Sequence, residues 1–211
     1  MKVAIIGGTG SLGRGLGLRL SKRHEVLIGS RDPRKGDDAA KKLKTLTGRE
    51  ILGGLATEVS AFCDAAVLAM PYDPEGSLLK TLRGQLAGKL VVSPIVPMKV
   101  EKGLFIYALS SGSAAEQAAA ALSESRVAAA IHTVPAPLLL DESDPLDFDA
   151  LVAADDRPTF EVAASLIRDI GALRPLYAGG LSQARLLEAQ VPLLLNLARL
   201  NGLRNPSVRF V

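Results

Sequence analysis

Short apolar runs alternate with longer stretches of helical periodicity along most of the chain. The runs have the length of buried strands, whereas the longer stretches repeat apolar positions every three or four residues. The expected strands are Lys2–Ile6, Glu25–Ile28, Ile51–Leu55, Ala65–Met70, Leu90–Ser93, Val127–Thr133, Leu151–Ala154 and Arg174–Tyr177. The expected helices are Arg14–Arg23, Asp37–Thr47, Val59–Phe62, Glu75–Leu86, Ala114–Leu122, Pro158–Ile170 and Ser182–Leu200. This order predicts an α/β fold whose mainly parallel sheet is covered by helices on both faces.

The chain is expected to divide after residue 136. Residues 1–136 contain most of the strand–helix repeats, and residues 137–211 would form a smaller C-terminal α/β cap. The segment Leu138–Asp147 is acidic and contains proline, so we expect an exposed loop there. The last helix has Ser182 as a suitable N-cap and Gly202 as a suitable stop.

Composition narrows the classes of partner. The 211 residues carry a net charge of +3 and only 4% aromatic side chains, which is a poor match to a nucleic-acid surface. Mild positive charge suits a small anionic ligand instead. The single Cys63 excludes an internal disulfide framework, and His24 and His132 are too far apart in the sequence to suggest a metal site.

Two features of the sequence bear on location. The most apolar helical stretch, Ala189–Ala198, falls short of the roughly 20 residues that span a bilayer. Met1 leads directly into the first expected strand, which leaves no room for a signal peptide. We therefore expect a cytoplasmic protein that has no membrane partner.

A glycine-rich turn joins the first strand to the first helix. Gly8-Thr9-Gly10-Ser11-Leu12-Gly13 fits the pattern G-x-G-x-x-G, and its position between a strand and a helix makes the pattern specific. Gly8 would form the tight turn, Gly10 would let the backbone approach a pyrophosphate, and Gly13 would let the helix pack closely. The turn predicts a Rossmann-type dinucleotide-binding domain.

The residues after the second strand distinguish between the two nicotinamide dinucleotides. NAD-binding folds place an acidic residue at this strand end for the ribose hydroxyls. Here the strand ends in Gly29 and is followed by Ser30 and Arg31, with Asp32 too late and Lys35 close behind. A hydroxyl and a guanidinium bind a 2′-phosphate that a carboxylate would repel. The sequence therefore predicts NADP(H).

Several further stretches carry a family resemblance. The segments "GGTGSLGRGL", "KLVVSPIVP", "SAAE", "IHTVPA" and "LRPLYAGGLSQARLLEA" occur in an order that resembles the NADPH-dependent coenzyme F420 reductases. The resemblance extends over nearly the whole chain. It implies a Rossmann fold and hydride transfer between NADP(H) and the deazaflavin coenzyme F420.

The resemblance also implies roles for individual residues. Thr9, Gly10, Ser11 and Leu12 would line the pyrophosphate, and Ser30, Arg31 and Lys35 the 2′-phosphate. Met70, Val96 and Ala136 follow strands where the nicotinamide half would lie. His132 and Val134 would flank the meeting point of the two rings, and Arg185 and Pro206 would face the deazaflavin.

The terminal helix differs from the family pattern, which carries hydroxyl residues there. This chain has Ala184, Ala189 and Val191 instead, so hydrogen bonds to the deazaflavin would be lost. Two alternatives therefore stay open. One is an NADPH-dependent reductase of another acceptor (a flavin, a quinone, a ferric chelate or a small imine), and the other is a non-catalytic NADPH sensor. The leucine-rich stretch "VPLLLNLARL", together with the resemblance, predicts a homodimer.

Overall fold

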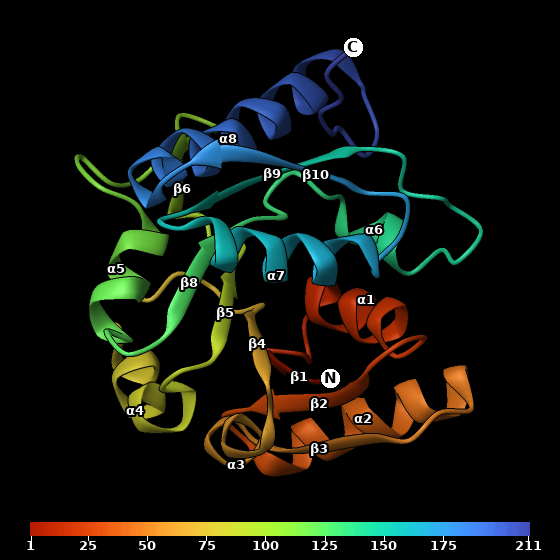
Figure 1. The fold of residues 1–211 in the computed structure, drawn as a ribbon. Coiled ribbons are helices and arrows are strands. Elements are labelled where there is room, and N and C mark those ends of the chain that lie inside the picture. The colour runs from red at the N-terminus through yellow and green to blue at the C-terminus, as the bar shows by residue number, and fades with distance from the viewer.

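An eight-stranded sheet forms the centre of the protein in the computed structural model, which describes residues 1–211 (Figure 1). The strands are β1 (Lys2–Ile6), β2 (Glu25–Ser30), β3 (Ile51–Leu55), β4 (Ala65–Leu68), β5 (Leu90–Ser93), β8 (Arg126–Ala129), β9 (Asp149–Ala154) and β10 (Arg174–Gly179). Their spatial order is β10-β9-β8-β5-β4-β1-β2-β3. The part β3-β2-β1-β4-β5-β8 has the order of a Rossmann sheet, and only β8 and β9 pair antiparallel. The predicted fold class is confirmed.

Helices cover both faces of this sheet. They are α1 (Ser11–Leu20), α2 (Pro33–Thr47), α3 (Ala56–Phe62), α4 (Ser77–Leu86), α5 (Ala114–Ala121), α6 (Ala136–Leu139), α7 (Arg157–Arg168) and α8 (Ala184–Asn201), with a short 3₁₀ turn at Leu181–Gln183. Residues of α1, α2, α6 and α7 share one hydrophobic core with alternate strand residues such as Ile5 and Val67. Residues of α3, α4, α5 and α8 share the other core with the intervening residues such as Ile6 and Leu68. The central strands are therefore buried on both sides, as their continuous apolar runs predict, whereas the edge strands β3 and β10 are partly exposed.

The C-terminal strands extend the main sheet. Strand β9 pairs with β8 through Ala153 and Ala154, and β10 continues the sheet beyond β9. The cap therefore shares a sheet with the first part of the chain, and the division after residue 136 stays a prediction. Helix α8 ends at Asn201, and its C-cap Gly202 has the left-handed conformation at φ 65°, as the sequence indicates. The expected N-cap Ser182 is wrong: Gln183 is the N-cap, because Leu181–Gln183 form a 3₁₀ turn before α8 begins.

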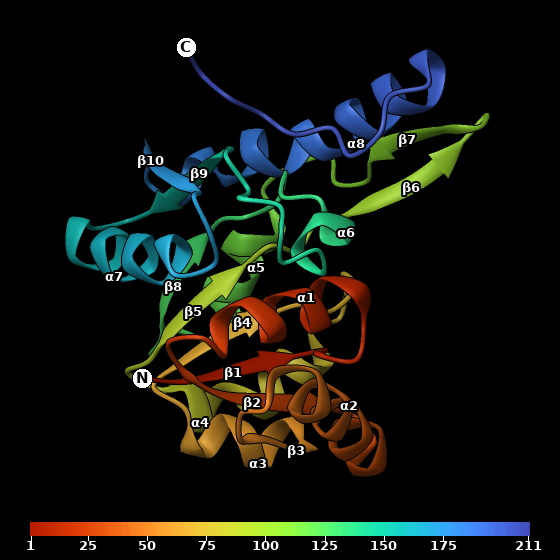
Figure 2. The ribbon, with the colours of Figure 1, turned by 90° about the vertical axis from the view of Figure 1, so that its right-hand side faces the viewer.

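A hairpin between β5 and α5 was not predicted. Strands β6 (Met98–Glu101) and β7 (Leu104–Tyr107) pair antiparallel, and every residue of β6 is exposed. The hairpin lies along α8 and projects from the body with the C-terminal half of that helix (Figure 2). Lys102 and Gly103 form its turn, both at positive φ. A two-residue turn of this kind between two short strands is a hairpin signal in the sequence.

Two further local expectations are wrong. The segment Leu138–Asp147 is not fully exposed, because Leu139 and Leu146 are completely buried. Helix α1 begins at Ser11 instead of Arg14, since Gly10 serves as its N-cap without any side-chain hydrogen bond to mark it.

Candidate nucleotide-binding site

The glycine turn brings β1, β4 and α1 into close backbone contact. Gly7, which the sequence motif does not include, adopts φ 86°, and a Cβ there would lie 2.4 Å from the carbonyl oxygen of Ala69. A Cβ on Gly13 would lie 2.5 Å from the Cα of Gly8. Only glycine fits at either position, so the turn is held by its backbone shape. A second glycine directly after the strand, at Gly7-Gly8, is the sequence signal that could have identified Gly7.

The N-terminus of α1 has the properties of an anion site. The cap Gly10 offers no side-chain acceptor, and the first turn contains no acidic residue. The first intrahelical bond runs from Arg14 N to Gly10 O, so the amides of Ser11, Leu12 and Gly13 have no helical partner. A Cβ on Gly10 would find nothing closer than 3.7 Å, which leaves room above the turn. Such free amides at the positive end of a helix dipole suit a pyrophosphate.

The end of β2 carries hydroxyl and positive groups. Ser30 is nearly buried, and its hydroxyl accepts a hydrogen bond from Asp32 N at 3.3 Å. The Asp32 carboxylate accepts from Arg34 N at 3.0 Å and caps α2, which accounts for the acid placed late in this loop. Arg31, Arg34 and Lys35 are exposed, and none of them forms an ion pair. Three unpaired cations beside a hydroxyl fit the 2′-phosphate of NADP(H).

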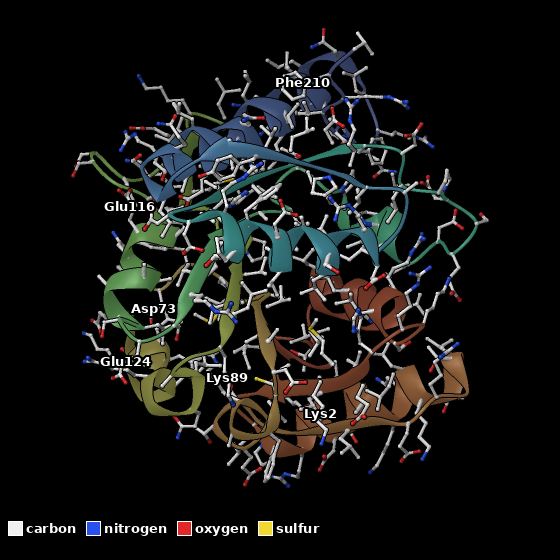
Figure 3. The ribbon with its side chains drawn as sticks, in the orientation of Figure 1. Lys2, Asp73, Lys89, Glu116, Glu124 and Phe210 are labelled. Atoms are coloured by element: carbon white, nitrogen blue, oxygen red, sulfur yellow. The ribbon has the colours of Figure 1, made fainter.

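The residues predicted for the nicotinamide half lie in three neighbouring loops at the carboxyl ends of the strands. Met70 follows β4, Val96 follows β5 and Ala136 begins α6 after β8, and all three are partly exposed. Met70 also lines a cavity of about 340 Å³ between the β4–α4 loop and α5. Asp73, labelled in Figure 3 beside α4 and α5, and Lys80 are among the polar residues of that cavity.

His132 and Val134 follow β8 but point to opposite faces of the sheet. The His132 ring lies against Leu151, Leu187 and Gln190 on the α8 side, and its Nε2 is shielded from solvent without a hydrogen-bond partner. Burial lowers the pKa of His132 to about 3, so the ring is neutral near pH 7. Val134 is 6% exposed and packs in the core shared with α1 and α7. The two side chains are not brought together, and the roles predicted for them stay predictions.

Arg185 contacts the protein itself. Its guanidinium donates to the carbonyl oxygens of Gly112 at 3.2 Å and Leu109 at 3.1 Å, and it lies over the Tyr107 ring at 5.1 Å. The side chain thus holds the loop between the hairpin and α5. Its predicted contact with the deazaflavin stays a prediction.

The tail that contains Pro206 is fastened where β9 and β10 begin. Asp149 N donates to Val208 O at 2.8 Å, and the Asp149 carboxylate receives two bonds from Arg174 at 2.6 and 2.8 Å. These Arg174 bonds hold the pKa of Asp149 at about 2. Because β9 runs antiparallel to β8, its start lies beyond the carboxyl end of β8, at the edge of the sheet that carries the predicted nucleotide contacts. Figure 3 marks Phe210, near the end of this tail, on the α8 side of the molecule.

Other kinds of site find little support in the structure. No group of three or more His, Cys, Asp or Glu side chains is arranged to hold a metal ion. None of the helices combines the length and the apolarity needed to cross a bilayer. The cytoplasmic location stays a prediction.

Comparison with known proteins decides the family. Residues 2–97 match the family model described as NADP oxidoreductase coenzyme F420-dependent. The F420-dependent NADP reductase of Methanothermobacter thermautotrophicus is 40% identical over 99% of this chain and 94% of its own length. The chain belongs to the F420-dependent NADP reductase family. The reductase of that name from Methanocaldococcus jannaschii is 36% identical over 93% of this chain and 92% of its own length.

The fold agrees with this membership in the F420-dependent NADP reductase family. A solved structure from Arthrobacter sp. FB24 superposes with a TM-score of 0.83 and covers 100% of this chain and 99% of that one, at 24% identity. The match includes the C-terminal strands and α8, so the extended sheet is common to both folds. The family resemblance seen in the sequence is confirmed.

Proposed function

We propose that this chain transfers a hydride between NADP(H) and the deazaflavin coenzyme F420. The observation that carries the proposal is the nearly full-length match to F420-dependent NADP reductases, which includes the residues after β8 and the terminal helix. The nicotinamide and the deazaflavin supply the redox chemistry when bound. The protein binds them, orients them and excludes water, so neither a nucleophile nor a metal ion is required.

The nucleotide would lie in a cleft along the carboxyl edge of the sheet. The free amides at the start of α1 would bind the pyrophosphate, and Ser30, Arg31 and Lys35 the 2′-phosphate. Met70, Val96 and Ala136 would border the nicotinamide half. His132 would contribute a neutral ring beside this position, since burial disfavours its cation. Pro206 and the tail would close the deazaflavin side, and Arg185 would act there directly or through the loop that it holds.

Anaerobic mixing of the purified protein with NADPH and F420 tests the activity. We expect NADPH to be consumed while F420 is reduced in equal amount, as followed by the absorbance of both coenzymes. Parallel reactions contain FMN, FAD, a quinone, a ferric chelate or a cyclic imine in place of F420. Turnover with one of these and none with F420 would select the alternative acceptor, with the missing hydroxyls at Ala189 and Val191 as the physical reason. NADPH binding without turnover of any acceptor would select the sensor.

We further propose that the chain forms a homodimer through α8 and the β6–β7 hairpin. Both elements expose large apolar side chains: Leu186, Leu193, Leu197 and Leu200 on α8, and Met98, Val100 and Leu104 on the hairpin. The edge of the hairpin that faces α8 is already satisfied, because Asn196 exchanges bonds of 2.8 and 2.7 Å with the backbone of Phe105. The remaining apolar surface is of the kind that marks an interface, and a second copy is the partner that a C2 arrangement would supply.

Light scattering at micromolar concentration tests the dimer. We expect twice the 22.1 kDa mass of one chain. Leu197→Glu should shift the mass towards one chain, whereas Leu46→Glu, on an even more exposed leucine of α2, should leave it unchanged. A monomeric wild-type protein would refute the proposal.

A further inference from the structure

Arg19 is a buried cation without an acidic partner. It lies in the last turn of α1, is only 4% exposed, and forms no ion pair. A buried charge is costly unless its surroundings satisfy it. The Arg19 guanidinium donates only to backbone carbonyl oxygens: Leu139 and Leu138 at 3.0 Å each, Asp144 at 2.9 Å, and Asp141.

These four carbonyls belong to one segment, the excursion from Ile131 to Leu146 between β8 and β9. The oxygens of Leu138 and Leu139 are at the C-terminal end of α6, where a helix lacks internal donors and favours a cation. Lys22 adds an exposed ion pair of 2.7 Å to Glu142 in the same segment. The last turn of α1 and the turn that follows it therefore hold the excursion through one buried side chain, Arg19, and one exposed side chain, Lys22.

The excursion begins and ends in strained backbone. Ile131 and Leu146 both adopt φ 58°, a left-handed conformation that is unfavourable for bulky or β-branched residues, and both are buried. Such conformations persist only where the surrounding structure holds them. Close packing of α6 on α1 contributes as well, since a Cβ on Gly15 would lie 2.4 Å from the Cβ of Leu139.

The segment that Arg19 grips carries the proposed nicotinamide contact. Ala136 is two residues before Leu138 in the same short helix, and His132 is next to the strained Ile131. The N-terminal end of α1 offers the amides proposed for the pyrophosphate. Helix α1 thus contacts both halves of the proposed nucleotide site: the glycine-rich turn at its N-terminal end faces the pyrophosphate, and Arg19 in its last turn holds the segment beside the nicotinamide.

We propose that Arg19 is a positioning residue that fixes the excursion 131–146 relative to α1 and so sets where the nicotinamide half lies. The inference rests on the proposed function, because it assumes that the nicotinamide lies beside Ala136. Arg19 touches neither coenzyme. Its effect should be on the rate of hydride transfer, since displacing reacting groups by about 1 Å costs on the order of 100-fold in rate.

The test compares Arg19→Met with Lys22→Met. Arg19→Met removes a cation of α1 that bonds the excursion, and Lys22→Met removes one in the turn after α1, but only the first removes buried hydrogen bonds. For Arg19→Met we expect kcat to fall about 10- to 100-fold. The dissociation constant of adenosine 2′,5′-bisphosphate, which probes only the 2′-phosphate end, should stay within about twofold of wild type. Hydrogen–deuterium exchange of the amides in 131–146 should speed up. Lys22→Met should change none of these.

Three results would overturn the positioning role. The first is a wild-type kcat in Arg19→Met. The second is a loss of kcat in Lys22→Met as large as that in Arg19→Met. The third is a loss of bisphosphate affinity in Arg19→Met by the same factor as the loss of kcat. Should Arg19→Met fail to give a cooperative urea transition, Arg19→Lys takes its place. It keeps the charge without the planar fork, so an intermediate loss of kcat supports the role and wild-type rate and exchange refute it.

Failure of the proposed function can be distinguished from failure of the positioning role. If wild-type protein does not react with F420, that proposal fails, and kcat is replaced by the affinity for NADPH. Weaker NADPH binding by Arg19→Met at unchanged bisphosphate binding, with faster exchange in 131–146, then supports the positioning role. Unchanged NADPH binding refutes it.

Discussion

The two ends of the proposed cleft are built by different means. The end formed by β1, α1 and β2 depends on local contacts. Gly7 and Gly13 allow close backbone contacts that a Cβ would prevent, and Asp32 caps the helix that directly follows it. At the end formed by β8, α6 and α8, buried charges hold segments that are distant in sequence. Arg19, Asp149 and Glu188 are the buried charged residues of the protein. Each binds a part of the chain after residue 105.

Glu188 shows the second kind of construction most fully. Its carboxylate, on α8, accepts from the Tyr107 hydroxyl at 2.6 Å and from the amides of Ala114 and Ala115 at 2.9 and 3.0 Å. It thereby joins the hairpin, the start of α5 and the terminal helix. Burial raises the pKa of Glu188, and burial together with this carboxylate raises the pKa of Tyr107. The difference between the two ends teaches that local motifs describe one half of the cleft, while the other half depends on long-range polar contacts.

The largest expected effect follows from removing Glu188. Glu188→Ala leaves the two α5 amides and the Tyr107 hydroxyl without their acceptor, and we expect a loss of about 3 kcal/mol in the free energy of unfolding by urea titration. Glu161→Ala, at an exposed position of α7, should cost less than about 0.5 kcal/mol.

The same pair of variants tests the comparison between the two ends. Glu188→Ala should leave the affinity for adenosine 2′,5′-bisphosphate unchanged, because the 2′-phosphate end does not use this carboxylate. If the bisphosphate binds more weakly in proportion to the lost stability, the two ends are not independent.

The contrast also accounts for what the sequence could predict. The six Rossmann strands and the glycine turn depend on contiguous patterns, and the sequence places them within a few residues. The exception at that end is Gly7, where the need for glycine arises from the Ala69 carbonyl directly after β4. The basic cluster after β2 could also be predicted, because Ser30 and Arg31, and the absence of an acidic residue at the strand end, are visible in adjacent positions of the sequence.

The other end was harder to predict, because its contacts join residues that are far apart in the sequence. An arginine within the apolar run of α1 and a glutamate among the leucines of α8 are visible in the sequence, but their partners lie at Leu138 and Ala114. The strands of the hairpin have little buried surface, so the pattern that marks core strands is missing there. His24 follows α1 in a turn, yet its side chain is 6% exposed and bonds Asp169 at 3.0 Å, again a distant partner.

A smaller effect, confined to binding, is expected from the 2′-phosphate end. Arg31→Ala should weaken NADPH binding about 10- to 100-fold, or roughly 1.5–3 kcal/mol, because a charge-assisted contact to phosphate is lost. The affinity for NADH should hardly change. Fluorescence titration of both nucleotides measures the effect.

Lys41→Ala is the matched control, since Lys41 is an exposed cation further along α2. It should leave NADPH binding within about twofold of wild type, because surface charges far from the ligand are screened. A parallel loss of NADPH and NADH affinity in Arg31→Ala would contradict the assignment of this end to NADP(H).

The smallest expected effect is a pH dependence at the other end, from His132. Its pKa is lowered to about 3 in the folded protein, against an ordinary value of 6.5, so the unfolded chain binds the additional proton between those values. Stability from this group is therefore complete above pH 6.5 and declines as the pH falls towards 3. Between pH 6.5 and 5.5 the loss should be about 1 kcal/mol. His132→Gln, which cannot take up the proton, should flatten this part of the pH profile measured by urea titration.

The titration of Asp149 does not interfere, because stability from a carboxylate with a pKa of about 2 is lost only at and below pH 4. An equally steep decline in His132→Gln would show that the neutral ring does not contribute to this pH dependence.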